Sequence, residues 1–367
     1  MGRMSKLSQE LDPEFIRIRE ERDRLVEKER SHKSLLDDMR RQRDSAIKAT
    51  EALNRKCDLL TSIDDLAYSE PLWLSPSDKK SMPSVHHGIA NLMLSDLHLD
   101  EVVNPAEINS VNAYNRAIAV RRMQMLIERT CEVAFDFING ITYDGITVWL
   151  GGDIFSGNIH EELKATNEAP IMATVDFWVD HLVAALLTLA QEFGKVHVPG
   201  VVGNHGRNTY KPVMKNRVED NFDWLTYRII YRELKNDDRF TWQLPVSTDV
   251  TVRHYEHTYL MTHGDQFRGG SGISGIQTPL ALGAFRKSKR QQAVGDPFDT
   301  MLLGHFHQYM TLPGVLVNGS LKGYCEYSAI SNFGFEVPQQ AFWVTTPERG
   351  PAFHVPIQPM NRKAEKW

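Results

Sequence analysis

The chain of 367 residues is poor in cysteine, with only Cys57, Cys131 and Cys325 and no CxxC pair. Three scattered cysteines argue against a disulfide framework and against a cysteine-ligated zinc site, so we expect a cytoplasmic protein, in the host cytoplasm if it is viral. No run of 18 apolar residues occurs, and no apolar stretch lies near the N-terminus. We therefore expect no membrane span, no membrane partner and no secretory signal.

The segment 1–62 contains a single aromatic side chain, Phe15, and no glycine after Gly2. It carries 15 basic and 13 acidic side chains. Such a segment cannot bury a core by itself, and we expect one long helix over about Pro13 to Leu60. Apolar residues recur at seven-residue spacing in it, although most partner positions are charged, which is an incomplete coiled-coil pattern. The repeat comprises Ile18, Leu25, Met39, Ala46, Leu53 and Leu60.

Two interpretations of this helix remain open. One is self-association or docking, giving a homo-oligomer or a complex with a protein partner; the other is a solvated helix that packs one stripe on the rest of the chain. Beyond it, prolines in a Ser-rich stretch mark a linker. We divide the chain into a charged helical extension (1–62), a linker (63–88), a globular domain (89–355) and a C-terminal tail (356–367).

The globular part alternates apolar, β-branched runs with segments of helical periodicity. This alternation predicts an α/β fold with a mainly parallel sheet and helices on its faces. The predicted strands are Ile89–Ser95, Ile146–Leu150, Val196–Val202, Phe240–Leu244, Val250–Tyr255, Thr258–Thr262, Met301–Leu303, Val315–Val317 and Ala341–Thr345, and the predicted helices are Asn112–Asn139, Met172–Phe193 and Val218–Leu234.

Five of the predicted strands end in turns that carry carboxylate, amide or imidazole side chains. The carboxyl ends of parallel strands meet at one edge of a sheet, and unpaired polar groups gathered there would be costly to bury. A metal cluster supplies the missing partner, so we expect a metal site at this edge. The turns carry Asp96 and His98, Asp153, Asn204 and His205, His263, and His305 and His307.

The order D-x-H, G-D, G-N-H, H and G-H-x-H resembles the calcineurin-like metallophosphoesterase superfamily. The G-H-x-H ending is similar to the nuclease and phosphodiesterase branches, the run GDIF to SbcD-type DNA exonucleases, and the whole chain to phosphoesterases encoded by tailed phages. The resemblance implies an α/β fold of the layered α+β kind, a four-layer sandwich of two mixed β-sheets flanked by helices, here with an added long N-terminal helix. Residues 89–355 would be its catalytic domain.

The resemblance also implies a site for two divalent cations. Such a pair, about 3.5–4 Å apart, can bridge a hydroxide for in-line attack on phosphorus and clamp a phosphate oxygen. Four imidazoles in the shell suit Mn, Fe or Zn better than Mg or Ca, and we expect Mn. Asp96, His98, Asp153 and His307 would hold the first ion, and Asp153, Asn204, His263 and His305 the second, with Asp153 shared.

His205 is the family's counterpart of the acid that protonates the leaving oxygen. This chain departs from the family around it, because Gly206 stands where Asp or Glu is usual and Ser156 stands where a carboxylate often lies. Asp100 and Asp265 are the candidates that would orient the His205 ring. A purely structural role for His205 remains the alternative.

Candidate substrate contacts are His160, in the excursion after the second strand, and Arg207, which follows the G-N-H turn. Residues 286–290 carry four basic side chains suited to a phosphate backbone, although residues 63–367 have a net charge of −7. We predict a binuclear metal-dependent phosphohydrolase, a phosphodiesterase or nuclease whose phosphodiester substrate is DNA. The alternatives are a phosphodiesterase or phosphatase for small or cyclic nucleotides and, more remotely, a non-catalytic scaffold.

Overall fold

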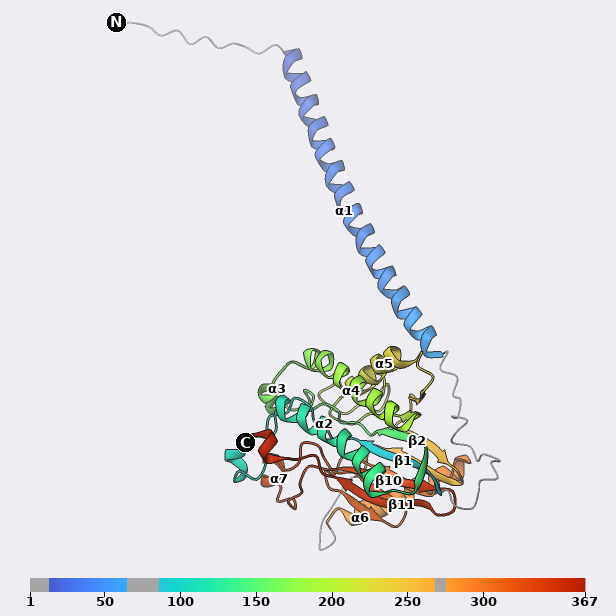
Figure 1. The fold of residues 1–367 in the computed structure, drawn as a ribbon. Helices are drawn as coiled ribbons and strands as arrows, with labels where there is room; N and C mark the ends of the chain where they lie inside the picture. The colour runs from blue at the N-terminus through green and yellow to red at the C-terminus, as the bar shows by residue number, and fades with distance from the viewer. Residues whose placement is uncertain (1–12, 65–85, 268–274, 367) are drawn as a thin grey trace. The chain divides into compact units, whose positions relative to one another are not determined.

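The computed structural model describes residues 13–64, 86–267 and 275–366, and the chain divides into two compact units, Met1–Ser69 and Glu70–Trp367 (Figure 1). The described part of the first unit, residues 13–64, is one helix, α1 (Pro13–Asp64), which confirms the predicted long helix and extends it by four residues. Most of the predicted linker, residues 65–85, lies outside the described residues.

Among the described residues of the second unit, the strands form two β-sheets. The first has the strand order β11-β10-β1-β2-β3-β4 and the second β5-β6-β7-β9-β8. In the first sheet β1, β2, β3 and β4 run parallel, β10 is antiparallel to β1, and β11 is antiparallel to β10. In the second sheet β6, β7 and β9 run parallel, with β5 and β8 antiparallel at the edges. The strands are β1 His86–Leu94, β2 Ile141–Leu150, β3 Val196–Pro199, β4 Phe240–Gln243, β5 Asp249–His254, β6 His257–Thr262, β7 Thr300–Leu303, β8 Met310–Leu312, β9 Val315–Val317, β10 Gln340–Thr346 and β11 Gly350–Ile357.

Helices cover the outer faces of both sheets. In Figure 1, α2 (Arg116–Glu132), α4 (Ile171–Phe193) and α5 (Phe222–Leu234) lie on one side of the first sheet, and a shared apolar cluster joins them to it. On the other side, α6 (Gln277–Val294) packs Leu280 against apolar residues of the second sheet. The four-layer sandwich of two mixed sheets flanked by helices is thereby confirmed.

The two sheets enclose an apolar core rich in aromatic rings. Trp149 of β2 and Trp343 of β10 stack with ring centroids 6.1 Å apart, and both are fully buried. Their indole N–H groups donate to Asn91 Oδ1 and to the Tyr259 hydroxyl, at 3.0 and 3.1 Å. Neither indole N–H group is therefore left without an acceptor inside the core. These packed rings form a rigid support for the strand ends.

Helix α4 is the one helix of the described residues that is long and apolar enough to cross a membrane by length and composition. Its buried side chains, among them Trp178, Leu182, Leu186 and Leu189, belong to the core cluster shared with β2 and β3. A core helix satisfies the same composition test, and we interpret α4 as one.

The remaining described elements are η1 (Pro105–Ile108), the π-turn η2 (Val133–Phe137) and the short helices α3 (Glu161–Thr166), α7 (Glu326–Ile330) and α8 (Arg362–Glu365). The segment expected as a tail, 356–367, ends β11 and forms α8. Arg122 of α2 donates to both carboxylate oxygens of Glu365, at 3.1 and 3.0 Å, and both side chains are buried. The end of the described chain is therefore tied to the sandwich.

Candidate metal centre

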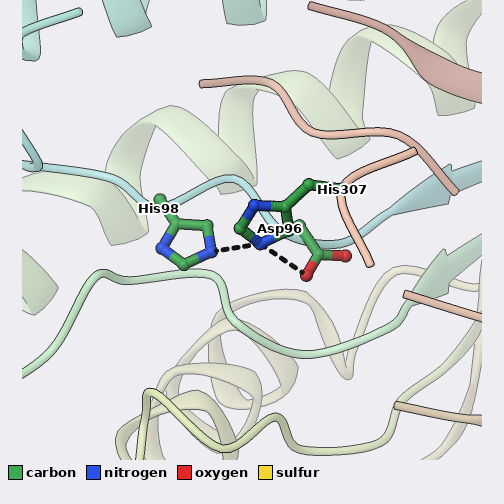
Figure 2. A group of neighbouring side chains, drawn as sticks. All are labelled: Asp96, His98 and His307. Carbon is green, nitrogen blue, oxygen red and sulfur yellow. Dashed lines mark hydrogen bonds and ion pairs between the residues drawn. The ribbon is translucent and has the colours of Figure 1, made fainter. Parts of the chain in front are cut away.

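The first group of candidate ligands lies beyond the carboxyl ends of β1 and β7. Figure 2 shows Asp96, His98 and His307 pointing toward one another. The Nε2 atoms of His98 and His307 are 2.9 Å apart, and His307 Nε2 is 3.4 Å from Asp96 Oδ1. One ligand atom from each of the three lies within 4.8 Å of the others. A carboxylate oxygen and two imidazole nitrogens thus lie close together, which is a donor set that could hold a metal ion.

The second group forms where β2, β3, β6 and β7 end. Asp153, His263 and His305 again offer ligand atoms within 4.8 Å of one another. His263 Nε2 lies 3.0 Å from Asp153 Oδ2 and 3.2 Å from Asn204 Oδ1, which brings Asn204 into the same group. His263 Nδ1 donates to the Gly151 carbonyl at 2.8 Å. That bond orients the ring so that Nε2 faces the group.

The two groups are adjacent. His98, Asp153 and His205 form a third set within 4.8 Å, and the His98 and His205 ring centroids are 4.7 Å apart. The structure thus brings all eight predicted ligand and acid residues into one region, in three overlapping groups linked by His98 and Asp153. Their division into two ligand sets stays a prediction.

The backbone at these positions is strained. Asp96, His98, Asp153, His305 and His307 have φ between 46° and 70°, in the left-handed region that non-glycine residues rarely adopt. Each such residue costs about 1–3 kcal/mol and persists only where the surrounding structure enforces it. Five of the seven predicted ligands share this conformation, so the strain is concentrated at the cluster, as it is at functional sites in general.

The donor set suits divalent metal ions. Burial lowers the pKa of His98 to about 3 and that of His305 to about 4, so both imidazoles are neutral at pH 7 and keep a lone pair for a metal. Against the effect of burial, His263 holds the pKa of Asp153 well below its usual range. Asp153 in turn raises the pKa of His263 to about 10, and the two groups lie 3.0 Å apart. In the metal-free protein a protonated imidazole therefore balances the buried carboxylate, and a bound cation would take over that role.

Behind the first group lies a buried ion pair that the sequence analysis missed. Glu101 Oε2 is 3.3 Å from His98 Nδ1 and accepts a hydrogen bond from the Ser156 hydroxyl at 2.7 Å. Its other oxygen accepts from Lys322 Nζ at 2.8 Å. All four side chains are buried. The only available signal was that Glu101 follows Asp96 closely, because Lys322 lies far from both in the sequence.

The His205 ring is oriented by a backbone carbonyl. Its Nδ1 donates to Ser156 O at 2.8 Å, and its backbone N–H donates to Asp153 Oδ1 at 2.7 Å. Neither expected carboxylate orients it. Asp100 accepts from Arg116, Thr174 and Trp178, and Asp265 accepts from Arg217. The prediction of Asp100 or Asp265 was wrong because both carboxylates have arginine partners that sequence reasoning did not foresee.

A second residue that the sequence analysis missed is Asp223, at the start of α5. It hydrogen-bonds to the turns that follow β2 and β3. Its carboxylate accepts from the backbone N–H groups of Asp153, Ile154 and Gly203 at 3.0, 3.2 and 2.9 Å. A Cβ at Gly206 would lie 2.9 Å from the Asp223 carboxyl carbon and 2.3 Å from Asn221 Oδ1. Position 206 must therefore be glycine, and an acid supplied by α5 occupies the space beside it.

The predicted substrate contacts differ in their surroundings. His160 is exposed, and its ring lies 6.1 Å from the His205 ring between centroids. Arg207 donates to the carbonyls of Asn204, Thr209 and Tyr210, so its guanidinium ties its own loop. In the basic run, Lys287 and Arg290 both pair with Asp249. These contacts leave His160 as the better placed of the two predicted contacts for a substrate.

Comparison with known proteins finds no matching family model and no matching curated protein. Among solved structures, Vps29 from Entamoeba histolytica, as a single mutant, is 14% identical, covers 73% of this chain and 98% of its own, and has a TM-score of 0.29. A predicted phosphoesterase from Streptococcus pneumoniae is 10% identical, with coverages of 73% and 97% and a TM-score of 0.27. The sulfate thiohydrolase SoxB from Thermus thermophilus is 10% identical, with coverages of 76% and 57% and a TM-score of 0.28. At such TM-scores, function has to be argued from the chain's own residues.

Proposed function

We propose that this protein is a binuclear metal-dependent phosphoester hydrolase of the calcineurin-like kind. The observation that carries the proposal is the pair of ligand groups that meet at Asp153, built from the ends of β1, β2, β3, β6 and β7 on a strained backbone. Two carboxylates and five imidazoles gather in these groups, a concentration of largely buried polar side chains that a purely structural role does not require.

In this proposal Asp96, His98, His307 and Asp153 hold one cation and Asp153, Asn204, His263 and His305 hold the other. Two such cations, with Mn as our first choice, supply an activated water and neutralise phosphoryl oxygens. The surrounding residues orient the ligand rings. The Gly151 carbonyl accepts from Nδ1 of His263 and so turns its Nε2 toward the metal centre, and Glu101 lies 3.3 Å from Nδ1 of His98.

His205 serves as the general acid for the leaving oxygen. Since Nδ1 donates to the Ser156 carbonyl, Nε2 is the nitrogen that exchanges a proton with the substrate. Burial lowers the pKa of His205 in the metal-free protein, whereas Asp153 opposes that effect. A bound anionic phosphate would favour the protonated form in the same way as Asp153 does. The exposed ring of His160 would contact the outer part of the substrate.

For the substrate, we propose a phosphodiester, with DNA as the first choice and small or cyclic nucleotides as the alternative. The support is the resemblance of the G-H-x-H ending to phosphodiesterases and nucleases. The Mn-loaded protein should hydrolyse bis-p-nitrophenyl phosphate faster than p-nitrophenyl phosphate, and Asp153→Asn should abolish both activities together with metal binding. Hydrolysis of the monoester alone would overturn the diester assignment. Metal binding without hydrolysis of either ester, of single- or double-stranded DNA or of cyclic nucleotides would favour the scaffold.

We also propose that α1 mediates self-association. Ile18, Leu25 and Met39 recur on its seven-residue repeat and are each about 60% exposed. Light scattering on the full chain should give a dimer or larger species, and Leu25→Glu with Met39→Glu should give a monomer. The matched control, Glu27→Gln with Arg40→Gln, changes exposed positions off the repeat. A monomeric wild-type chain would contradict self-association, and the alternative would then be that α1 binds a different protein.

A further inference from the structure

The carboxylate of the candidate ligand Asp96 contacts a fully buried polar network that the function proposed above does not use. Its Oδ2 atom accepts a hydrogen bond from the Ser95 hydroxyl at 2.6 Å, whereas Oδ1 accepts from the backbone N–H of His305 at 2.9 Å. Oδ1 is also the oxygen that lies 3.4 Å from His307 Nε2 (Figure 2). The two oxygens therefore face different neighbours: Oδ1 faces a candidate ligand and Oδ2 faces Ser95.

Two amide side chains fix the direction of the hydrogen bond from Ser95. Asn318, directly after β9, accepts from the Ala341 backbone N–H through Oδ1 at 2.7 Å, so Nδ2 is the atom that faces Ser95. Nδ2 donates to Ser95 Oγ and to Gln340 Oε1, at 2.9 Å each. Gln340 in turn accepts from the Ser95 backbone N–H at 3.1 Å and donates to the Ser95 carbonyl at 3.1 Å. Backbone groups thus set the orientation of both amides.

The Ser95 hydroxyl has a single hydrogen to donate. Because its oxygen already accepts from Asn318, that hydrogen is directed to Asp96 Oδ2. A hydrogen bond to a charged oxygen is stronger than one between neutral groups. The network therefore delivers one strong hydrogen bond to a defined oxygen of a candidate metal ligand.

The turn that begins with Gly304 packs against the same pair of groups. A Cβ at this position would lie 2.4 Å from Asp96 Oδ2 and 2.7 Å from Ser95 Oγ, which is closer than such atoms can approach. Glycine is therefore required directly before His305. Since His305 donates its backbone N–H to Oδ1, the turn and the network together hold both oxygens of the carboxylate.

We propose that Ser95 is a positioning residue for the first metal site: its hydroxyl, directed by Asn318, fixes the Asp96 carboxylate so that Oδ1 is the oxygen presented to the ion. The proposal rests on the binuclear function proposed above and adds a residue that contacts neither the ion nor the substrate. Without the hydroxyl, Oδ2 would lose its donor and the carboxylate would be held at one oxygen only. Outer partners of metal ligands typically contribute 10–100-fold to metal affinity.

Ser320 offers a matched control for Ser95. Its hydroxyl is likewise buried and also donates to Asp96, at 2.8 Å, but to the backbone carbonyl and not to the carboxylate. Ser95→Ala and Ser320→Ala therefore each delete one buried hydroxyl that is bonded to the same residue. A purely structural role of Ser95 predicts similar behaviour of the two variants, whereas a positioning role predicts that only Ser95→Ala changes metal binding.

The test is calorimetric titration of the metal-free full chain with Mn, together with denaturant unfolding of each metal-free variant. Wild type should show two Mn sites. Ser95→Ala should weaken one of them by about 10–100-fold and keep the other. Ser320→Ala should keep both sites, even where it lowers the free energy of unfolding as much as Ser95→Ala does.

The outcomes separate this proposal from the proposed function. If the two variants bind Mn alike, or if Ser95→Ala weakens both sites equally, the assignment of Ser95 is wrong while the phosphoesterase stands. If the wild-type chain binds no Mn and hydrolyses no ester, the proposed function fails and the role of Ser95 fails with it.

Discussion

Glu101 Oε2 lies 3.3 Å from Nδ1 of His98, while its other oxygen accepts a hydrogen bond from Lys322 Nζ. The buried ammonium holds the pKa of Glu101 well below its usual value even though burial opposes this. The carboxylate is therefore charged and lies beside Nδ1 of His98, while Nε2 of the same ring faces His307. Through the Ser156 hydroxyl the same carboxylate contacts the residue whose carbonyl orients His205.

Glu101→Gln should weaken metal binding and destabilise the fold. Removing such an outer partner of a metal-binding histidine typically costs 10–100-fold in affinity, and Lys322 would be left charged and buried, a loss of about 3–5 kcal/mol. Adding Lys322→Met should restore much of the free energy of unfolding without restoring Mn affinity. Titration calorimetry and denaturant unfolding measure the two effects separately. Glu128→Gln, at an exposed position of α2, is the control, and a Glu101→Gln protein with wild-type Mn affinity would contradict the role.

His205→Ala should keep both metal ions and lose turnover, by about 10²–10⁴-fold as is usual for general acids. The loss should be largest for esters with poor leaving groups, which need the proton most. Elemental analysis and kcat for a series of aryl diesters measure the two effects. Because His205 also lies within ligand distance of His98 and Asp153, loss of one metal equivalent would show that it is a ligand. His160→Ala is the comparison variant, because His160 is exposed and is proposed to contact substrate only. It should raise KM more than it lowers kcat.

Much of this site could be predicted because its residues follow directly after apolar strands. Once β1, β2 and β3 are recognised as parallel strands, Asp96, Asp153 and Asn204 must meet at one edge. The supporting residues could not be found in this way. Glu101 is recognisable only once Lys322 is known to face it, and Asp223 only once α5 is known to start beneath Gly203. Their partners are distant in sequence, and several are backbone groups that carry no residue identity.

The elements that sequence reasoning missed have identifiable causes. Strand β11 contains Pro351 and Pro356, which argue against a strand, and it forms because an edge position tolerates the absent N–H donors. Helix α6 buries Gly283, Lys287 and Gln291 along with Leu280. Hydrophobic periodicity does not reveal a helix whose buried stripe is largely not apolar. Phe267 packs where a Gly283 side chain would lie, which explains that glycine.

Asp223→Asn should loosen the turns after β2 and β3. The amide N–H₂ of asparagine would face backbone donors that now bond the carboxylate, and a mismatched buried donor costs about 1–3 kcal/mol. Burial raises the pKa of Asp223 to about 7, so its charge adds less to the fold than its acceptor geometry does. We expect lower unfolding free energy and weaker binding of the cation held by Asp153 and Asn204. Titration calorimetry with Mn should show that one of the two metal sites is weakened. The control Asp238→Asn, at an exposed position, should change neither the unfolding free energy nor Mn binding.

The stability of the sandwich should fall in acid through His197. This residue of β3 is buried, with Nδ1 2.9 Å from Thr241 Oγ1, and burial lowers its pKa from 6.5 to about 4. Between pH 6.5 and pH 4 His197 is protonated in the unfolded chain but neutral in the folded chain. The contribution of His197 to the free energy of unfolding is therefore complete above pH 6.5 and is lost as the pH falls to 4. At about 1.4 kcal/mol per pH unit, the interval corresponds to about 3 kcal/mol. Guanidinium unfolding of the metal-free protein at pH 7 and pH 4.5 should show this loss for wild type and a smaller one for His197→Gln. The metal-centre histidines titrate in both proteins, so an identical loss in the two would exclude His197 as the cause.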